Sequence, residues 1–208
     1  MKPERRLLIG KIVCWGLGLF QLARLLGGAY YQASYLGANP LDKGLNLLGW
    51  WALFFLTLTL VWTPLSQWTG QPWWKQLQRL TGLFSFTFAV PHLGMYIYFD
   101  QEHNWSYILM DLGDRKFILL GFMAFIILLV LALTSSRYWQ RRLGSGWKKL
   151  HRLTYGAAIL GAIHFTYRMK AGLRHPEVKT FVLVITFLLL VRAWPWLKSH
   201  VLPRVSKA

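Results

Sequence analysis

The stretch FILLGFMAFIILLVLALT, residues 117–134, runs without a single charged side chain. A helix that spans a bilayer needs about 20 consecutive, mostly apolar residues. Within hydrocarbon every backbone N–H and C=O must be bonded inside the segment, so a helix is expected for a run of this length. The short alternating segments that would close a barrel are absent from the sequence. Residues 117–134 therefore predict a transmembrane helix.

Five further apolar segments flank this run. The predicted spans are residues 7–26, 45–65, 77–99, 117–134, 150–167 and 178–194. The 208-residue chain is 55% hydrophobic, which is too apolar for an ordinary soluble domain. Short connections between the spans leave no room for a separate soluble domain. We expect one all-α integral membrane domain over residues 1–208, with six transmembrane helices that form a bundle.

The formal net charge of +17 could indicate a nucleic-acid-binding protein. The charges, however, gather between the apolar runs, which favours the lipid bilayer as partner and excludes nucleic acid. With a cytoplasmic N-terminus, the inner segments hold more than twice as many Lys and Arg residues as the outer ones. The outer segments then hold Asp42, Asp100, Glu102, Asp111, Asp114 and Glu177. The positive-inside rule places both termini in the cytoplasm, with the basic loop 168–179 as an exception.

Histidines carry the chemical signal, because the lone Cys14 excludes a disulfide and a cysteine-ligated metal cluster. Three histidines fall in loops or the tail and are expected to be solvated: His103, His175 and His200. The other three belong to predicted spans: His92, His151 and His164. An ionisable residue at membrane depth is costly and marks a functional site by default.

The depth of two histidines is the informative feature. His92 lies 14 residues beyond Gln78, and His164 lies 13 residues beyond His151, which is roughly 20 Å into each helix. Both helices enter from the same side, so the two imidazoles reach one level in the outer half of the membrane. Two such imidazoles can supply the axial ligands of a heme. No catalytic residue is predicted.

Other interpretations of these residues stay open. His92 and His164 could be neutral core histidines that bond to each other or to carbonyl groups, whereas zinc would need a third ligand. His151 is either an interfacial histidine in a basic loop or the ligand of a second heme. Glycines on the two helices would suit a macrocycle close to the backbone: Gly82, Gly94, Gly156 and Gly161. No internal repeat is apparent.

Several motifs resemble one known family. They are LGANP at 36–40, RLTGL at 79–83 leading to His92-Leu93, LALTS at 131–135, and WKKLHRLTY at 147–155 leading to Ile163-His164. In this order, and over nearly the whole chain, they resemble the MsrQ (YedZ) family of ferric-reductase-like transmembrane proteins.

The resemblance implies a heme-binding subunit in the bacterial inner membrane. It assigns heme b to His92, His151 and His164, and it links the family to FMN. It further implies electrons from quinone or a cytosolic flavin reductase, and a periplasmic molybdenum-containing methionine sulfoxide reductase subunit as acceptor. The rival functions are a stand-alone ferric or small-molecule reductase and a non-redox transporter or scaffold.

Overall fold

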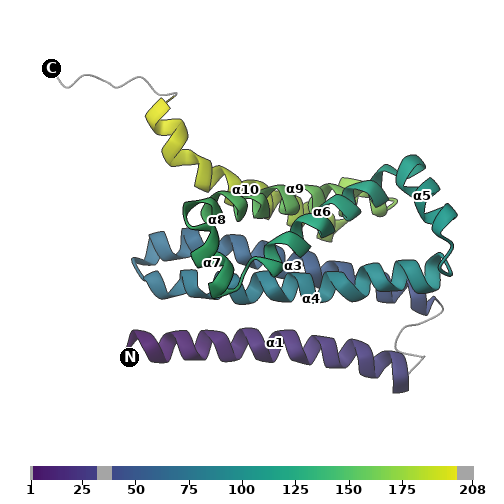
Figure 1. Cartoon of the computed structure of the whole chain (residues 1–208), viewed down its shortest axis with the longest axis horizontal. Coiled ribbons are helices and arrows are strands. Elements are labelled where there is room, and N and C mark those ends of the chain that lie inside the picture. The colour runs from purple at the N-terminus through teal and green to yellow at the C-terminus, as the bar shows by residue number, and fades with distance from the viewer. Residues whose placement is uncertain (1, 32–38, 201–208) are drawn as a thin grey trace.

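In the computed structural model, residues 2–31 and 39–200 are described, and they form helices without a strand (Figure 1). The side chains of residues 26, 28–31 and 195–200 are not described. Residues 36–38 of the first family motif and the side chain of His200 therefore lie outside the described part. The helices are α1 (Pro3–Tyr31), α3 (Pro40–Thr69), η1 (Pro72–Leu77), α4 (Gln78–Met95), η2 (Tyr96–Asp100), α5 (Trp105–Asp114), α6 (Lys116–Leu133), α7 (Arg137–Leu143), α8 (Ser145–Leu150), α9 (Leu153–Arg168), η3 (Gly172–Arg174) and α10 (Pro176–His200).

Each predicted span coincides with a helix, which confirms the all-α class. Within the described residues, four segments are long and apolar enough to cross a membrane: Pro3–Leu25, Pro40–Thr69, Pro72–Asp100 and Lys116–Leu133. The chain is therefore a multi-pass membrane protein. Helices α9 and α10 lie at the fifth and sixth predicted spans but are not among these four. Six crossings and cytoplasmic termini thus stay predictions.

Capping residues determine where helix α3 begins and ends. Its N-cap, Asn39, accepts a hydrogen bond at 3.1 Å from the backbone N–H of Asp42, and Pro40 follows in the first turn, where its missing N–H costs nothing. The helix ends at Gly70, whose φ of 66° is the left-handed conformation that glycine adopts most readily. Between these limits, 30 residues span about 45 Å.

Buried polar contacts join α3 to α4. The Ser85 hydroxyl donates to the Ala52 carbonyl at 2.9 Å, and Trp62 Nε1 donates to Thr81 Oγ1 at 3.1 Å. Thr81 Oγ1 also lies 2.9 Å from the hydroxyl of Thr59. Ser85 and Thr81 have no exposed surface. Polar groups buried in this way stabilise a helix pair only when they are hydrogen-bonded, as these are.

Four helices form the central bundle. Helices α3 and α4 pack as one hairpin, and α6 and α9 pack as a second. Further contacts run between α4 and α6 and between α3 and α9, so α4 and α9 occupy opposite corners. The small, fully buried Ala157 and Ala158 of α9 share one core cluster with Leu53 of α3 and Leu128 of α6. Side chains that point inward from opposite corners therefore meet on the axis of the bundle.

Helices α1 and α10 lie outside this bundle (Figure 1). On α1, Trp15 packs edge-on against Phe84 of α4, with ring centroids 5.1 Å apart. On α10, Arg192 donates to the Leu60 carbonyl at 2.8 Å and to the Tyr155 hydroxyl at 2.6 Å. This arginine thereby ties α10 to both α3 and α9.

Candidate functional site

His92 of α4 and His164 of α9 face each other inside the bundle. Their ring centroids are 6.1 Å apart, and the ring planes are nearly perpendicular, at 86°. The expectation that the two imidazoles reach one level is confirmed. Because α4 and α9 occupy opposite corners, the pair lies between the two hairpins.

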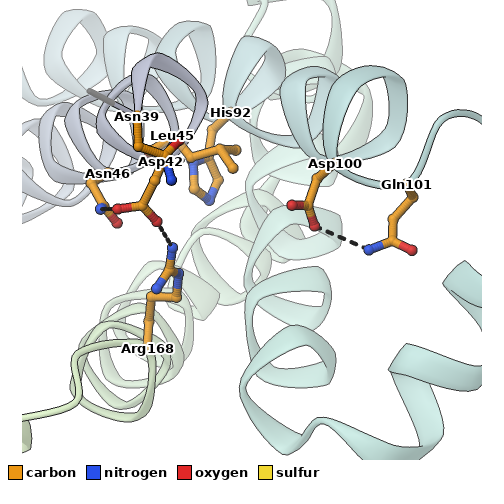
Figure 2. Close-up of polar contacts among 8 residues, drawn as sticks. All are labelled: Asn39, Asp42, Leu45, Asn46, His92, Asp100, Gln101 and Arg168. Carbon is orange, nitrogen blue, oxygen red and sulfur yellow. Dashed lines mark hydrogen bonds and ion pairs between the residues drawn. The ribbon is translucent and has the colours of Figure 1, made fainter. Parts of the chain in front are cut away.

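Both rings are held through the same nitrogen. His92 Nδ1 lies 2.9 Å from the Leu45 carbonyl oxygen, and His164 Nδ1 lies 2.7 Å from the Phe117 carbonyl oxygen (Figure 2 shows His92 beside Leu45). A carbonyl oxygen only accepts, so Nδ1 carries the proton in each ring. Each Nε2 therefore keeps its lone pair, and a hydrogen-bonded Nδ1 with a free Nε2 is the arrangement found in metal-binding histidines.

Two glycines make room for the rings. A Cβ on Gly49 of α3 would lie 3.0 Å from His92 Cε1, and a Cβ on Gly121 of α6 would lie 2.7 Å from His164 Nδ1. Any side chain at these positions would press on an imidazole. The glycines predicted to suit a macrocycle are different ones, on the histidine helices themselves, and that prediction stays open: Gly82, Gly94, Gly156 and Gly161. The space for the imidazole rings is left on the neighbouring helices, which was not predicted from the sequence.

The two hairpins repeat this arrangement at a constant offset of 72 residues, from 45 to 117, from 49 to 121 and from 92 to 164. In each half the histidine and the carbonyl that accepts from it are 47 residues apart. The expectation of no internal repeat was therefore wrong for the site. A sequence signal could have shown this repeat. In each half a glycine precedes the histidine by 43 residues, from 49 to 92 and from 121 to 164.

The pair fits a metal group that brings ligands of its own. Two imidazoles that bind one metal from opposite sides place their centroids about 6 Å apart, given metal–nitrogen bonds of about 2 Å and about 1 Å from nitrogen to ring centre. The observed 6.1 Å agrees with that spacing. Among residues 2–31 and 39–200, no group of three or more His, Cys, Asp or Glu side chains is placed to bind a bare metal ion. A metal macrocycle is thus the class of cofactor that suits the site.

The structure does not bring His151 to this pair. It precedes α9 at the opposite end from His164 and stacks on Trp147, with centroids 4.0 Å apart. Its Nε2 lies 3.2 Å from Thr134 Oγ1, whose own proton goes to the Val130 carbonyl at 2.7 Å. His151 must therefore donate from Nε2, which leaves Nδ1 as its free nitrogen, the reverse of the other two rings.

The matching level of α4 offers Gln78 and Arg79 and no histidine. There Gln78 donates to the Thr63 hydroxyl of α3 at 2.9 Å, and Arg79 is exposed. A second axial ligand opposite His151 is therefore not supplied by Gln78 in this arrangement.

The loop histidines behave differently from each other. His103 is exposed, as expected, and lies against the Tyr98 ring at 4.2 Å. His175 is half-buried, and its Nδ1 is buried without a hydrogen-bond partner among the described residues, so the expectation of a solvated side chain was wrong there. Neither residue joins the pair on the bundle axis.

The fold and site define a multi-pass membrane protein whose helical bundle carries a pair of facing imidazoles. A model of the family described as "Ferric reductase like transmembrane component" matches residues 48–162, which include His92 and end two residues before His164.

Curated relatives narrow the family. A protein-methionine-sulfoxide reductase heme-binding subunit MsrQ of Xanthomonas oryzae pv. oryzae is 34% identical over 204 residues, 96% of this chain and 92% of the relative. MsrQ proteins of Xanthomonas euvesicatoria pv. vesicatoria and Herminiimonas arsenicoxydans are 36% and 40% identical, over 85% and 78% of this chain and 82% and 76% of their own lengths. The chain belongs to the MsrQ family of ferric-reductase-like transmembrane proteins.

Proposed function

We propose that this protein is the heme-binding membrane subunit of a protein-methionine-sulfoxide reductase system, and that His92 and His164 are the axial ligands of its heme b. The observation that carries the proposal is the facing pair of imidazoles, 6.1 Å apart, each with Nε2 free. The printed names of the MsrQ relatives support the choice of heme over other metal macrocycles. The subunit is not an enzyme on its own.

The chain itself holds and orients the ligands. The carbonyls of Leu45 and Phe117 fix the tautomer of each histidine and restrain its ring, which leaves both Nε2 atoms without a proton. A bound heme supplies one-electron chemistry, with a potential set by its axial ligands and surroundings.

The proposed direction of electron transfer follows from which end of the bundle lies on which side of the membrane. With cytoplasmic termini in a bacterial inner membrane, His151 and the basic helices α7 and α8 form the inner end. The histidine pair then belongs to the outer half, close to a periplasmic acceptor. The proposal places the donor, quinone or a cytosolic flavin reductase, on the inner side, and a molybdenum-containing catalytic subunit on the outer side. A second heme at His151 and bound FMN stay predictions from the resemblance.

Loss of heme on substitution tests the ligand assignment. We expect His92→Ala and His164→Ala each to abolish the reduced-minus-oxidised heme spectrum of the protein purified in detergent. His103→Ala is the control, because this exposed imidazole is not part of the pair. A colourless wild-type protein would overturn the heme proposal. Unchanged heme bands in both variants would overturn the choice of ligands.

The description of the matching family model also fits one alternative function, a stand-alone reductase of iron or small molecules. Such a protein would reduce a chelated ferric substrate when supplied with reductant alone. The subunit proposal expects reoxidation of the reduced protein by the catalytic subunit and slow reoxidation by the chelate. Rapid turnover with the chelate alone would favour the alternative.

A further inference from the structure

An ion pair between Arg168 and Asp42 lies at the end of the bundle that holds the two histidines. Arg168 is four residues after His164 on α9, about 6 Å along the helix. Its guanidinium pairs with Asp42 in the first turn of α3, and Asp42 also accepts from Asn46 at 3.0 Å (Figure 2). Asn46 follows Leu45, whose carbonyl holds His92.

The ion pair also connects the two hairpins. Each histidine is held by its own hairpin, but Arg168 of α9 reaches across to Asp42 of α3. In the other half the residue at the matching position, Tyr96, donates to Asp111 of α5 at 3.0 Å. Asp111 in turn pairs with Arg115 at 3.0 Å, so each link includes a full positive charge. The two cations differ in exposure, because the Arg115 side chain is 54% exposed and that of Arg168 is 35% exposed, so water screens the charge of Arg168 less. The positive charge of Arg168 lies one helical turn from His164.

We infer that Arg168 and Asp42 set the reduction potential of the group bound between His92 and His164, with opposite signs. The inference rests on the proposed function, since it needs a heme at this pair. Uptake of one electron makes the centre one unit more negative. A nearby cation therefore stabilises the reduced form and raises the potential, whereas a nearby anion lowers it.

This role also accounts for a charge that the topology leaves unexplained. Arg168 begins the basic loop that breaks the positive-inside pattern. Its side chain is about one-third exposed, with 35% of its surface accessible, so water screens its charge only in part. A cation in this position keeps the centre reducible by a donor although both axial ligands are neutral imidazoles. Arg168 and Asp42 are not catalytic residues: their charges change the potential of the bound group without contact with the reacting atoms.

A redox titration of the heme-loaded protein in detergent tests the inference. We expect Arg168→Gln to lower the midpoint potential, Asp42→Asn to raise it, and Arg168→Lys to leave it close to that of the wild type. The matched controls remove the same charges from exposed positions nearby, Arg174→Gln and Asp114→Asn, and should shift it less. If the ion pair had a purely structural role, Arg168→Gln and Asp42→Asn would shift the midpoint potential in the same direction.

The outcomes separate this inference from the proposed function. Wild-type protein without heme would defeat the proposed function. Heme-loaded Arg168→Gln and Asp42→Asn with unchanged potentials, or with shifts of the same sign, would overturn the inference and leave the proposed function standing. If Arg168→Gln does not retain heme, the sign of the shift in Asp42→Asn decides.

Discussion

Replacing Gly121 with alanine should weaken heme binding while leaving the helix intact. The new Cβ would lie 2.7 Å from His164 Nδ1 and 2.8 Å from Cε1, whereas ordinary contact begins near 3.4 Å. The ring must therefore move by about 0.7 Å. It is held by a 2.7 Å hydrogen bond to the Phe117 carbonyl, one turn earlier on the same helix as Gly121. A shift of that size stretches the bond beyond its normal range.

The size of the effect follows from that hydrogen bond. A bond of this kind contributes about 0.5–1.5 kcal/mol, and about 1.4 kcal/mol is a tenfold change in an equilibrium constant. Loss of the partner that orients a metal-binding histidine typically costs about 10- to 100-fold in affinity. We expect heme to bind to Gly121→Ala about 10-fold more weakly, where the two ranges overlap. Helix stability should not fall, because alanine favours a helix by about 1 kcal/mol over glycine.

Two other glycines serve as controls, because alanine at these positions should disturb the site less than alanine at Gly121. A Cβ on Gly49 would lie 3.0 Å from the nearest atom of His92, so that ring needs to move by only about 0.4 Å. Gly49→Ala should therefore cost about twofold, the low end of the hydrogen-bond range. Gly94 lies on α4 near His92, and a Cβ there meets nothing within 4 Å, so Gly94→Ala should leave binding unchanged.

The assay is a titration of hemin into the heme-free protein in detergent, followed by absorbance, with thermal unfolding measured on the same samples. The reasoning predicts the order Gly121, Gly49, Gly94 from the largest to the smallest loss of affinity. Wild-type affinity in Gly121→Ala would refute it. So would equal losses in all three variants, or a loss that only accompanies unfolding.

Further predictions concern residues away from the pair. His151→Ala should keep the spectrum of the heme held at the other end of α9, because roughly 20 Å separates the two levels; loss of that spectrum would contradict the assignment. Arg192→Met should lower the free energy of unfolding by about 1.5–3 kcal/mol, since hydrogen bonds from a charged group are lost; denaturant unfolding in detergent measures it. Thr81→Val should cost about 1–3 kcal/mol in the same assay, because Trp62 Nε1 loses its acceptor, and an unchanged midpoint would count against that bond.

Part of the site follows directly from the order of residues along the chain. Hydropathy is a local property, so the apolar runs predict helices that the structure has within a few residues. Depth along a helix is local too, because each residue advances about 1.5 Å. Counting from the ends of two spans was therefore enough to predict that His92 and His164 meet, and they do.

The rest depends on which helices are neighbours. Leu45 and Phe117 carry no side-chain signal for holding a histidine, because their backbone carbonyls do so. Nothing in the uniform apolar run of α6 marks Gly121. Its role becomes visible only when α9 packs against α6 and brings His164 next to it.

The sequence by itself determined that this is a helical membrane protein with two histidines at one depth, because hydropathy and helical rise act along the chain. Only the tertiary structure decided which ring nitrogen is free, where space is left for each imidazole, and which charges lie beside the pair. Arg168 and Asp42 are 126 residues apart in the chain and become partners only through packing. Contacts between distant residues follow from how the helices pack together, and no local pattern specifies that packing.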